Sequence, residues 1–257
     1  MRAGLPLAIR RRLVPNERYG LRAALLGVAV VLVAVPFASL LFQVISKGAL
    51  TRIDGELADG LNEVVHRSPA SVTALEIISF FGRPIWFFPL VGAVAYWMWR
   101  IGRRRLTAFL IVTCLGGGIV NSAVKILVDR PRPIVDHPVH TAFGKSFPSG
   151  HSFGSVVCYG ALLLVLLPTL QSRRARRGAV VAVVALCLAI GSSRLLLGVH
   201  FLSDVIAGFV LALAWLTGAV AVFEVWRTEE GRRPIDPLAE GVEPEAAADL
   251  RESLPAS

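Results

Sequence analysis

Charged residues are scarce in this 257-residue chain, where Asp, Glu, Lys and Arg together make up 18% of the sequence. Hydrophobic residues make up 54%, and the mean hydropathy is +0.64. Soluble domains carry about a quarter charged residues, so the composition excludes an ordinary soluble domain. It indicates a polytopic membrane protein, with neither an internal repeat nor a second soluble domain.

Cysteine is also rare. The three residues Cys114, Cys158 and Cys187 each fall in a different apolar run. Their number and spacing fit neither a disulfide framework nor a metal site. We interpret them as small core residues.

Long apolar runs, by contrast, are abundant. A membrane-spanning helix needs roughly 20 apolar residues. Six segments reach that length, near 23–45, 73–99, 106–127, 152–170, 179–197 and 202–223. The second is the least regular, because Gly82, Arg83 and Pro84 interrupt it. The predicted fold is all-α, a polytopic membrane bundle of six transmembrane helices.

Arginine clusters flank alternate ends of these segments. They comprise Arg10, Arg11, Arg12, Arg18, Arg22, Arg100, Arg103, Arg104, Arg105, Arg173, Arg174, Arg176, Arg177, Arg227, Arg232 and Arg233. In a six-span topology all of them fall on one side, which the positive-inside rule makes cytoplasmic. We therefore expect a multi-pass protein of the cell (inner, cytoplasmic) membrane with both termini in the cytoplasm. The net charge of +9 then reflects topology, and no nucleic-acid partner is expected.

Composition divides the chain into three parts. We predict a basic cytoplasmic N-terminus over 1–22, the membrane domain over 23–226, and a disordered cytoplasmic tail, rich in Glu, Pro and Ala, over 227–257. Within the membrane domain, the loop 46–72 carries apolar residues at helical spacing: Leu57, Leu61, Val64 and Val65. This spacing predicts a short amphipathic helix on the outer surface.

Polar residues gather in three clusters at the predicted outer ends of spans three to six. The clusters contain Lys125 and Arg132, then Pro148, Ser149, Gly150 and His151, and then Ser193, Arg194, His200 and Asp204. A charged residue inside a bilayer costs a few kcal/mol, so these groups need water, partners or a ligand. Other polar residues of the outer loop are interpreted as a solvated group, with recognition of a headgroup as the alternative: Asp129, Arg130, Asp136, His137 and His140.

The cations of these clusters indicate an anionic ligand. Lys125, Arg132 and Arg194 would repel one another unless an anion lay between them. Arginine offers a planar fork suited to phosphate oxygens, and lysine a point charge. Since the chain has three lysines against 24 arginines, the position of Lys125 carries weight.

The segment Pro148-Ser149-Gly150-His151 has the composition of a helix start. Ser149 is a good N-cap, and Gly150 lets the backbone approach a ligand. The amides that follow would form an anion site at the helix N-terminus, with His151 able to donate a proton. We predict a phosphate-binding turn with an acid beside it.

His200 and Asp204 are four residues apart, so on a helix they share one face. Asp204 can accept the Nδ1 proton of His200, which leaves Nε2 free to attack an electrophile. The same pair would also allow His200 to act as a base on water.

The order K-x6-RP, PSGH and SR-x5-H-x3-D, from Lys125 to Asp204, resembles the phosphatidic acid phosphatase type 2 (PAP2) family of membrane lipid phosphatases. That family shares a superfamily with bacterial acid phosphatases and vanadium haloperoxidases, and every motif position is present here. The resemblance implies an acid phosphatase/vanadium haloperoxidase-like core. It also implies hydrolysis of a lipid phosphomonoester or pyrophosphate at the extracytoplasmic face.

The resemblance also implies residue roles. His200 would be the nucleophile of a phospho-histidine intermediate, Asp204 would orient it, and His151 would protonate the leaving group and then activate water. The phosphate-binding residues would be Lys125, Arg132, Ser149, Gly150 and Arg194. No metal and no cofactor is expected.

Several alternatives stay open at this stage. Polyprenyl pyrophosphate, such as the undecaprenyl form, is the favoured substrate because the site would face the compartment where that carrier is released. Phosphatidate and phosphatidylglycerophosphate fit as well. A vanadate-dependent haloperoxidase or a non-catalytic lipid-phosphate binding or transport protein could use the same fold, although binding alone would need only the cations.

Overall fold

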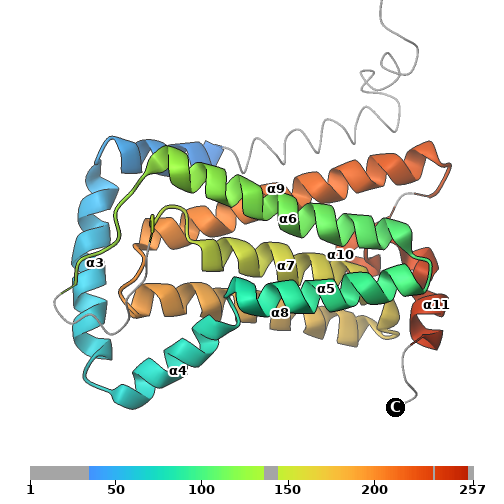
Figure 1. Ribbon diagram of the computed structural model, residues 1–257, viewed down its shortest axis with the longest axis horizontal. Coiled ribbons are helices and arrows are strands. Elements are labelled where there is room, and N and C mark those ends of the chain that lie inside the picture. Colours follow the sequence, from blue (N-terminus) through green and yellow to red (C-terminus); the bar gives the residue numbers. More distant parts are fainter. Residues whose placement is uncertain (1–34, 136–143, 234, 254–257) are drawn as a thin grey trace, which may run out of the picture.

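The computed structural model describes residues 35–135, 144–233 and 235–253, and within them the chain forms helices and no strands. The long helices are α5 (Pro84–Arg100), α6 (Arg104–Val128), α7 (Gly150–Leu166), α8 (Arg173–Leu196) and α9 (Leu202–Glu229). The shorter elements are α3 (Ala49–Val65), α4 (Pro69–Phe80), η1 (Leu167–Thr169), α10 (Pro237–Glu240), η2 (Pro244–Ala246) and α11 (Ala247–Glu252). The long helices run along a common direction, α3 crosses one end of the bundle, and α10 and α11 lie at the other (Figure 1).

Five segments are long and apolar enough to cross a membrane: Pro69–Arg100, Arg104–Val128, Gly150–Thr169, Arg173–Leu196 and Leu202–Arg227. A shorter apolar helix over Val35–Ile45 covers the described part of the first predicted span. The prediction of an all-α, multi-pass membrane bundle is confirmed. The basic residues predicted for 1–22 lie outside the described residues.

The irregular second span contains a corner. Helix α4 ends at Phe80 and α5 begins at Pro84, and α4 leans away from the bundle direction (Figure 1). Proline has no N–H and clashes with the preceding turn, so it starts a helix more readily than it continues one. The bundle therefore contains α5 from Pro84 onwards, and α4 forms an arm at the same end as α3.

Helix α7 is the central helix of the bundle. It contacts α5, α6, α8 and α9, which agrees with a sequence that is apolar on almost every side. Gly208 of α9 faces its first turn, where an added Cβ would lie 2.7 Å from the Ser149 carbonyl oxygen. A side chain at position 208 would push the two helix starts apart.

The predicted helix in the outer loop is present as α3, but its buried face differs from the expectation. Its buried residues are Asp54, Ala58, Asn62 and Val65, whereas Val64 is exposed. This face packs on α8 and α9. Asp54 is an acid on the buried face of this helix, where it meets polar partners inside the protein.

The described part of the C-terminal tail is ordered, unlike the predicted disordered segment. Val242, Ala246 and Leu250 are fully buried at the end of the bundle opposite α3. The guanidinium of Arg227 donates to both carboxylate oxygens of Glu245, at 2.9 and 2.8 Å. Because composition alone suggested disorder, the four-residue spacing of the three apolar residues was the missed signal.

Candidate active site

The three polar clusters converge at one end of the bundle. A cavity of about 1300 Å³ is lined there by the end of α6, the loop after it, the start of α7, the end of α8 and the turn before α9. The predicted site residues that line it are Lys125, Arg132, Gly150, His151, Arg194 and His200. Ser149 and Asp204 are fully buried and do not line it.

His200 and Asp204 contact each other, but not as two residues of one helix. His200 lies in the turn before α9, and Asp204 lies in the first turn of α9. His200 Nδ1 is 3.3 Å from Asp204 Oδ2. The same carboxylate oxygen accepts from the backbone N–H of Phe201 at 3.0 Å, as an acid at the third helical position does in a capping box. The helix start thus fixes the carboxylate that faces His200.

Arg132 determines which nitrogen of His200 carries the proton. Its Nη1 lies 3.1 Å from His200 Nε2 and also donates to the carbonyl of Val199 at 2.8 Å. Because a guanidinium can only donate, Nε2 accepts, and the proton resides on Nδ1 facing Asp204. Burial outweighs the nearby Asp204 carboxylate and lowers the pKa of His200 from 6.5 to about 4. His200 is therefore neutral at pH 7, with a lone pair on Nε2.

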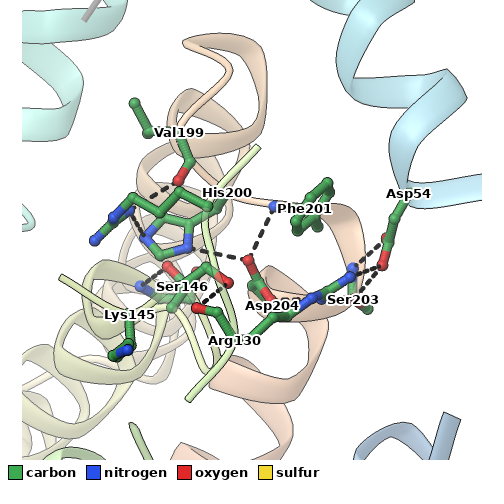
Figure 2. A network of polar contacts seen from close by, with 12 residues as sticks. Asp54, Arg130, Lys145, Ser146, Val199, His200, Phe201, Ser203 and Asp204 are labelled. Atoms are coloured by element: carbon green, nitrogen blue, oxygen red, sulfur yellow. Dashed lines mark hydrogen bonds and ion pairs between the residues drawn. The ribbon is translucent and has the colours of Figure 1, made fainter. Parts of the chain in front are cut away.

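Arg130 bridges two buried carboxylates. It donates to Asp204 Oδ1 at 2.7 Å and to Asp54 Oδ2 at 2.8 Å, and its guanidinium lies over the ring of Phe201 at 4.1 Å (Figure 2). Arg130 is 8% exposed, so the interpretation of this residue as a solvated loop cation is wrong. Ion pairs buried in this way hold their partners in a defined geometry.

Asp54 joins α3 to the start of α9. Its carboxylate accepts from the backbone N–H of Ser203 at 3.0 Å and from the Ser203 hydroxyl at 2.5 Å. Ser203 Oγ in turn accepts from Arg130 at 2.7 Å (Figure 2). The buried Asp54 carboxylate therefore accepts hydrogen bonds from Arg130 and Ser203, and Arg130 in turn binds Asp204.

Lys125 is held by the loop that leads to α7. Its Nζ donates to the carbonyls of Lys145 at 2.9 Å and Ser146 at 3.4 Å. The backbone N–H of Ser146 donates to the carbonyl of Arg130 at 2.9 Å. The lysine and the buried arginine are thus connected through the same segment.

The start of α7 agrees with the predicted N-cap. Ser149 has an extended backbone and its hydroxyl accepts from the N–H of Ser152. Its own N–H donates to the carbonyl of Asp204 at 2.9 Å, which ties α7 to α9. At Gly150 an added Cβ would meet Asn121 and Lys125 only at ordinary contact distance, 3.5 and 3.7 Å. No contact with the described part of the chain requires glycine there.

Two buried nitrogen atoms of the cavity wall have no hydrogen-bond partner among the described residues: His151 Nε2 and Arg194 Nε. Arg194 Nη1 donates to the hydroxyl of Ser79 at 2.5 Å. Buried polar atoms are nearly always satisfied, so unpartnered nitrogen atoms on a cavity wall indicate a polar ligand. The cationic character of the wall favours an anion as that ligand.

The cavity continues from the charged end into an apolar region. Its deeper walls come from α5, α6 and α7 and include Phe87, Leu115, Ile119 and Val157. A second cavity of about 410 Å³ follows between α5 and α6 and shares Leu115 with the first. Leu115 and Ile119 are also exposed on the outside of the protein, so the apolar region reaches the lipid-facing surface.

Sequence reasoning missed Asp54 and misassigned Arg130. Nothing in the loop 46–72 marked Asp54, because its partners lie far away in the chain. Arg130 lies next to Pro131 inside the first motif, which was the available signal. Asp129 is exposed and pairs with Lys145. Asp136, His137 and His140 lie outside the described residues, within which no group of three or more His, Cys, Asp or Glu side chains could hold a metal ion.

Comparison with known proteins agrees with this geometry. The profile of the PAP2 superfamily matches residues 105–227, which include all three polar clusters. Phosphatidylglycerophosphatase B of Bacillus subtilis is 30% identical over 154 residues, 58% of this chain and 74% of that protein. Lipid A 1-phosphatase of Rhizobium johnstonii is 28% identical over 183 residues, 61% of this chain and 69% of that protein.

A solved structure shares the fold. The transmembrane PAP2-type phosphatidylglycerolphosphate phosphatase from Bacillus subtilis superposes with a TM-score of 0.69, over 79% of this chain and 98% of that one, at 22% identity. With matching motifs, matching architecture and a curated relative at 30% identity, the chain belongs to the PAP2 superfamily.

Proposed function

We propose that this protein is an integral-membrane lipid phosphatase that releases inorganic phosphate from a lipid phosphomonoester or pyrophosphate. The observation that carries the proposal is the shared cavity. The cations predicted from the motifs and two histidines line its polar end, and an apolar region between α5 and α6 continues from it. Such a cavity suits a molecule with an anionic head and a hydrocarbon tail.

In the first step, His200 Nε2 attacks the phosphorus atom. A P–N bond forms, the bond between phosphorus and the leaving oxygen breaks, and His151 gives its proton to that oxygen. The charge that develops on the phosphoryl oxygens is stabilised by Lys125, Arg132 and Arg194, which are in place before the reaction begins. The Nη1 hydrogen bond of Arg132 passes from Nε2 to a phosphoryl oxygen when substrate binds.

In the second step, water attacks phosphorus and the P–N bond breaks, so that its electron pair returns to Nε2. His151, now neutral, accepts the proton of the attacking water. Asp204 keeps the Nδ1 proton of His200 in place through both steps and stabilises the cationic ring of the intermediate. Inorganic phosphate leaves, and the site returns to its starting protonation state.

The arrangement of charges supports an extracytoplasmic site. The ends of α5 and α9 and the starts of α6 and α8 carry the arginine clusters, and all of them lie at the end of the bundle opposite the cavity's polar residues. Under the positive-inside rule that end is cytoplasmic. The proposed substrates are therefore lipids of the outer leaflet, with polyprenyl pyrophosphate favoured and phosphatidate and phosphatidylglycerophosphate as further candidates.

Phosphate release by purified protein tests the proposal. We expect wild-type protein to release phosphate from at least one member of a panel of lipid phosphates and pyrophosphates, and vanadate to inhibit it. His200→Ala and His151→Ala should each abolish release. Full activity in either variant, or binding without turnover by the wild type, would overturn the assignment, and activation by vanadate would indicate a haloperoxidase.

A further inference from the structure

The corner between α4 and α5 lies outside the three sequence motifs yet is attached to the site at several points. Tyr159 donates to the carbonyl of Phe81 at 2.8 Å, and Arg194 donates to Ser79 just before the corner. Gly82 packs directly on His151, since an added Cβ would lie 2.7 Å from the His151 Cδ2 atom. These contacts fix the backbone of the corner relative to His151.

Arg83 follows Gly82 and its side chain lines the cavity. Among the described residues its guanidinium has neither a hydrogen-bond nor an ion-pair partner, although it is half-buried. A half-buried arginine usually pairs with an acid, but within the described ranges 35–135, 144–233 and 235–253 no Asp or Glu lines this cavity. Arg83 is therefore a fourth cation of the wall, beside Lys125, Arg132 and Arg194.

Arg83 belongs to the side of the cavity where His151 lies. The charges that act most strongly on His200 are those of Asp204, Arg132 and Lys125. The positive charge of Arg83 instead interacts electrostatically with His151 and Arg194. In an in-line displacement the nucleophile and the leaving group lie on opposite sides of phosphorus. A cation beside His151 is then next to the leaving oxygen.

The positive charge on the cavity wall exceeds the negative charge of a single phosphoryl group. A phosphomonoester carries a charge of about −1.5 to −2 at pH 7. Three cations already surround its oxygens in the proposed mechanism, and Arg83 adds a fourth positive charge on the leaving-group side. A leaving group that is itself a phosphate would bring the matching negative charge, whereas an alcohol would not.

We propose that Arg83 forms a leaving-group subsite that binds the second, lipid-attached phosphate of a lipid pyrophosphate. The inference rests on the proposed phosphatase function and narrows its substrate class. His200 attacks the terminal phosphorus, the bond between that phosphorus and the bridging oxygen breaks, and His151 protonates that oxygen. Arg83 donates to the oxygens of the departing lipid monophosphate, whose charge it compensates.

The test compares two lipids that differ by one phosphate, phosphatidate and diacylglycerol pyrophosphate with the same acyl chains. Initial rates of phosphate release are measured for wild type, Arg83→Gln and Arg83→Lys. Loss of one charge-assisted arginine–phosphate hydrogen bond corresponds to about a 10- to 100-fold effect. We expect Arg83→Gln to lower kcat/KM for the pyrophosphate by that factor and for phosphatidate by less than about 3-fold, with Arg83→Lys in between.

Arg100→Gln is the matched control, because it removes an exposed arginine from the opposite end of the same helix. It should leave both substrates unaffected. An equal loss on both lipids, or no loss on either, would overturn the leaving-group role of Arg83. If Arg83→Gln does not fold, the wild type alone decides: a higher kcat/KM for phosphatidate than for the pyrophosphate contradicts the subsite. Failure of the wild type to release phosphate from either lipid or any other would instead refute the phosphatase function.

Discussion

Arg130 and Asp54 form a buried ion pair, at 2.8 Å, between the loop after α6 and the helix that crosses the end of the bundle. The other Nη of Arg130 binds Asp204, so a single guanidinium connects α3 to the carboxylate that faces His200. Helix α3 therefore has a part in positioning the candidate nucleophile as well as covering the bundle.

Asp54→Asn tests this connection. The substitution leaves Arg130 with one carboxylate and removes an acceptor from Ser203, so we expect the free energy of unfolding to fall by about 3 kcal/mol. Because Asp204 loses part of its support, kcat should fall by up to about 100-fold while KM changes little. Thermal unfolding and phosphate release by the same preparation give both quantities.

Glu245→Gln is the control for Asp54→Asn, since it removes a carboxylate from an arginine pair at the other end of the bundle. It should lower stability with kcat retained. A normal kcat in folded Asp54→Asn protein would show that the α3 contact serves the fold alone.

The depressed pKa of His200 makes stability depend on pH. The folded protein holds His200 neutral down to about pH 4, whereas the unfolded chain protonates it near pH 6.5. Between these values the unfolded state binds more protons, so stability falls as the pH falls. Compared with His200→Gln, the wild type should lose about 3 kcal/mol between pH 6.5 and 4. Denaturant titrations at several pH values measure the difference, and a constant difference would contradict a buried neutral His200.

The apolar end of the cavity can be filled by substitution. Gly118 of α6 lines the cavity, and an added Cβ there meets no atom within 4 Å. Gly118→Leu should lower kcat/KM for long-chain substrates by about 10-fold, the lower end of the range for a displaced apolar contact, and spare short-chain ones.

Gly218→Leu is the matched control for Gly118→Leu, because Gly218 of α9 is equally open but lies outside the cavity. Equal effects of the two substitutions on long-chain substrates would argue against tail binding between α5 and α6.

The convergence of the motifs was predictable from their positions. Lys125 ends the third span, His151 starts the fourth, and Arg194 and His200 flank the turn between the fifth and the sixth, so a six-span topology places them at one end. The N-cap at Ser149 was predictable for a local reason, because capping depends only on residues within one helical turn. The roles of these side chains in the reaction remain predictions that the variants test.

Other parts of the site depend on contacts that no local pattern reveals. Asp54 and Arg130 are 76 residues apart, and only the packing of α3 on α9 brings them together. The interpretation of the tail failed for a similar reason. Its composition resembles that of disordered segments, but Leu250 and its apolar neighbours are buried against the bundle end. Burial of this kind depends on a surface that the rest of the chain supplies.

Trapping the covalent intermediate tests directly whether His200 is the nucleophile. Wild-type protein is mixed with lipid substrate that carries radioactive phosphorus in its terminal phosphate, quenched in alkaline detergent, and the labelled peptide is identified. The proposed mechanism predicts an alkali-stable, acid-labile phosphoprotein labelled at His200, and no label in His200→Ala. Label that persists in His200→Ala, or rapid phosphate release by the wild type with no phosphoprotein at any time, would contradict it.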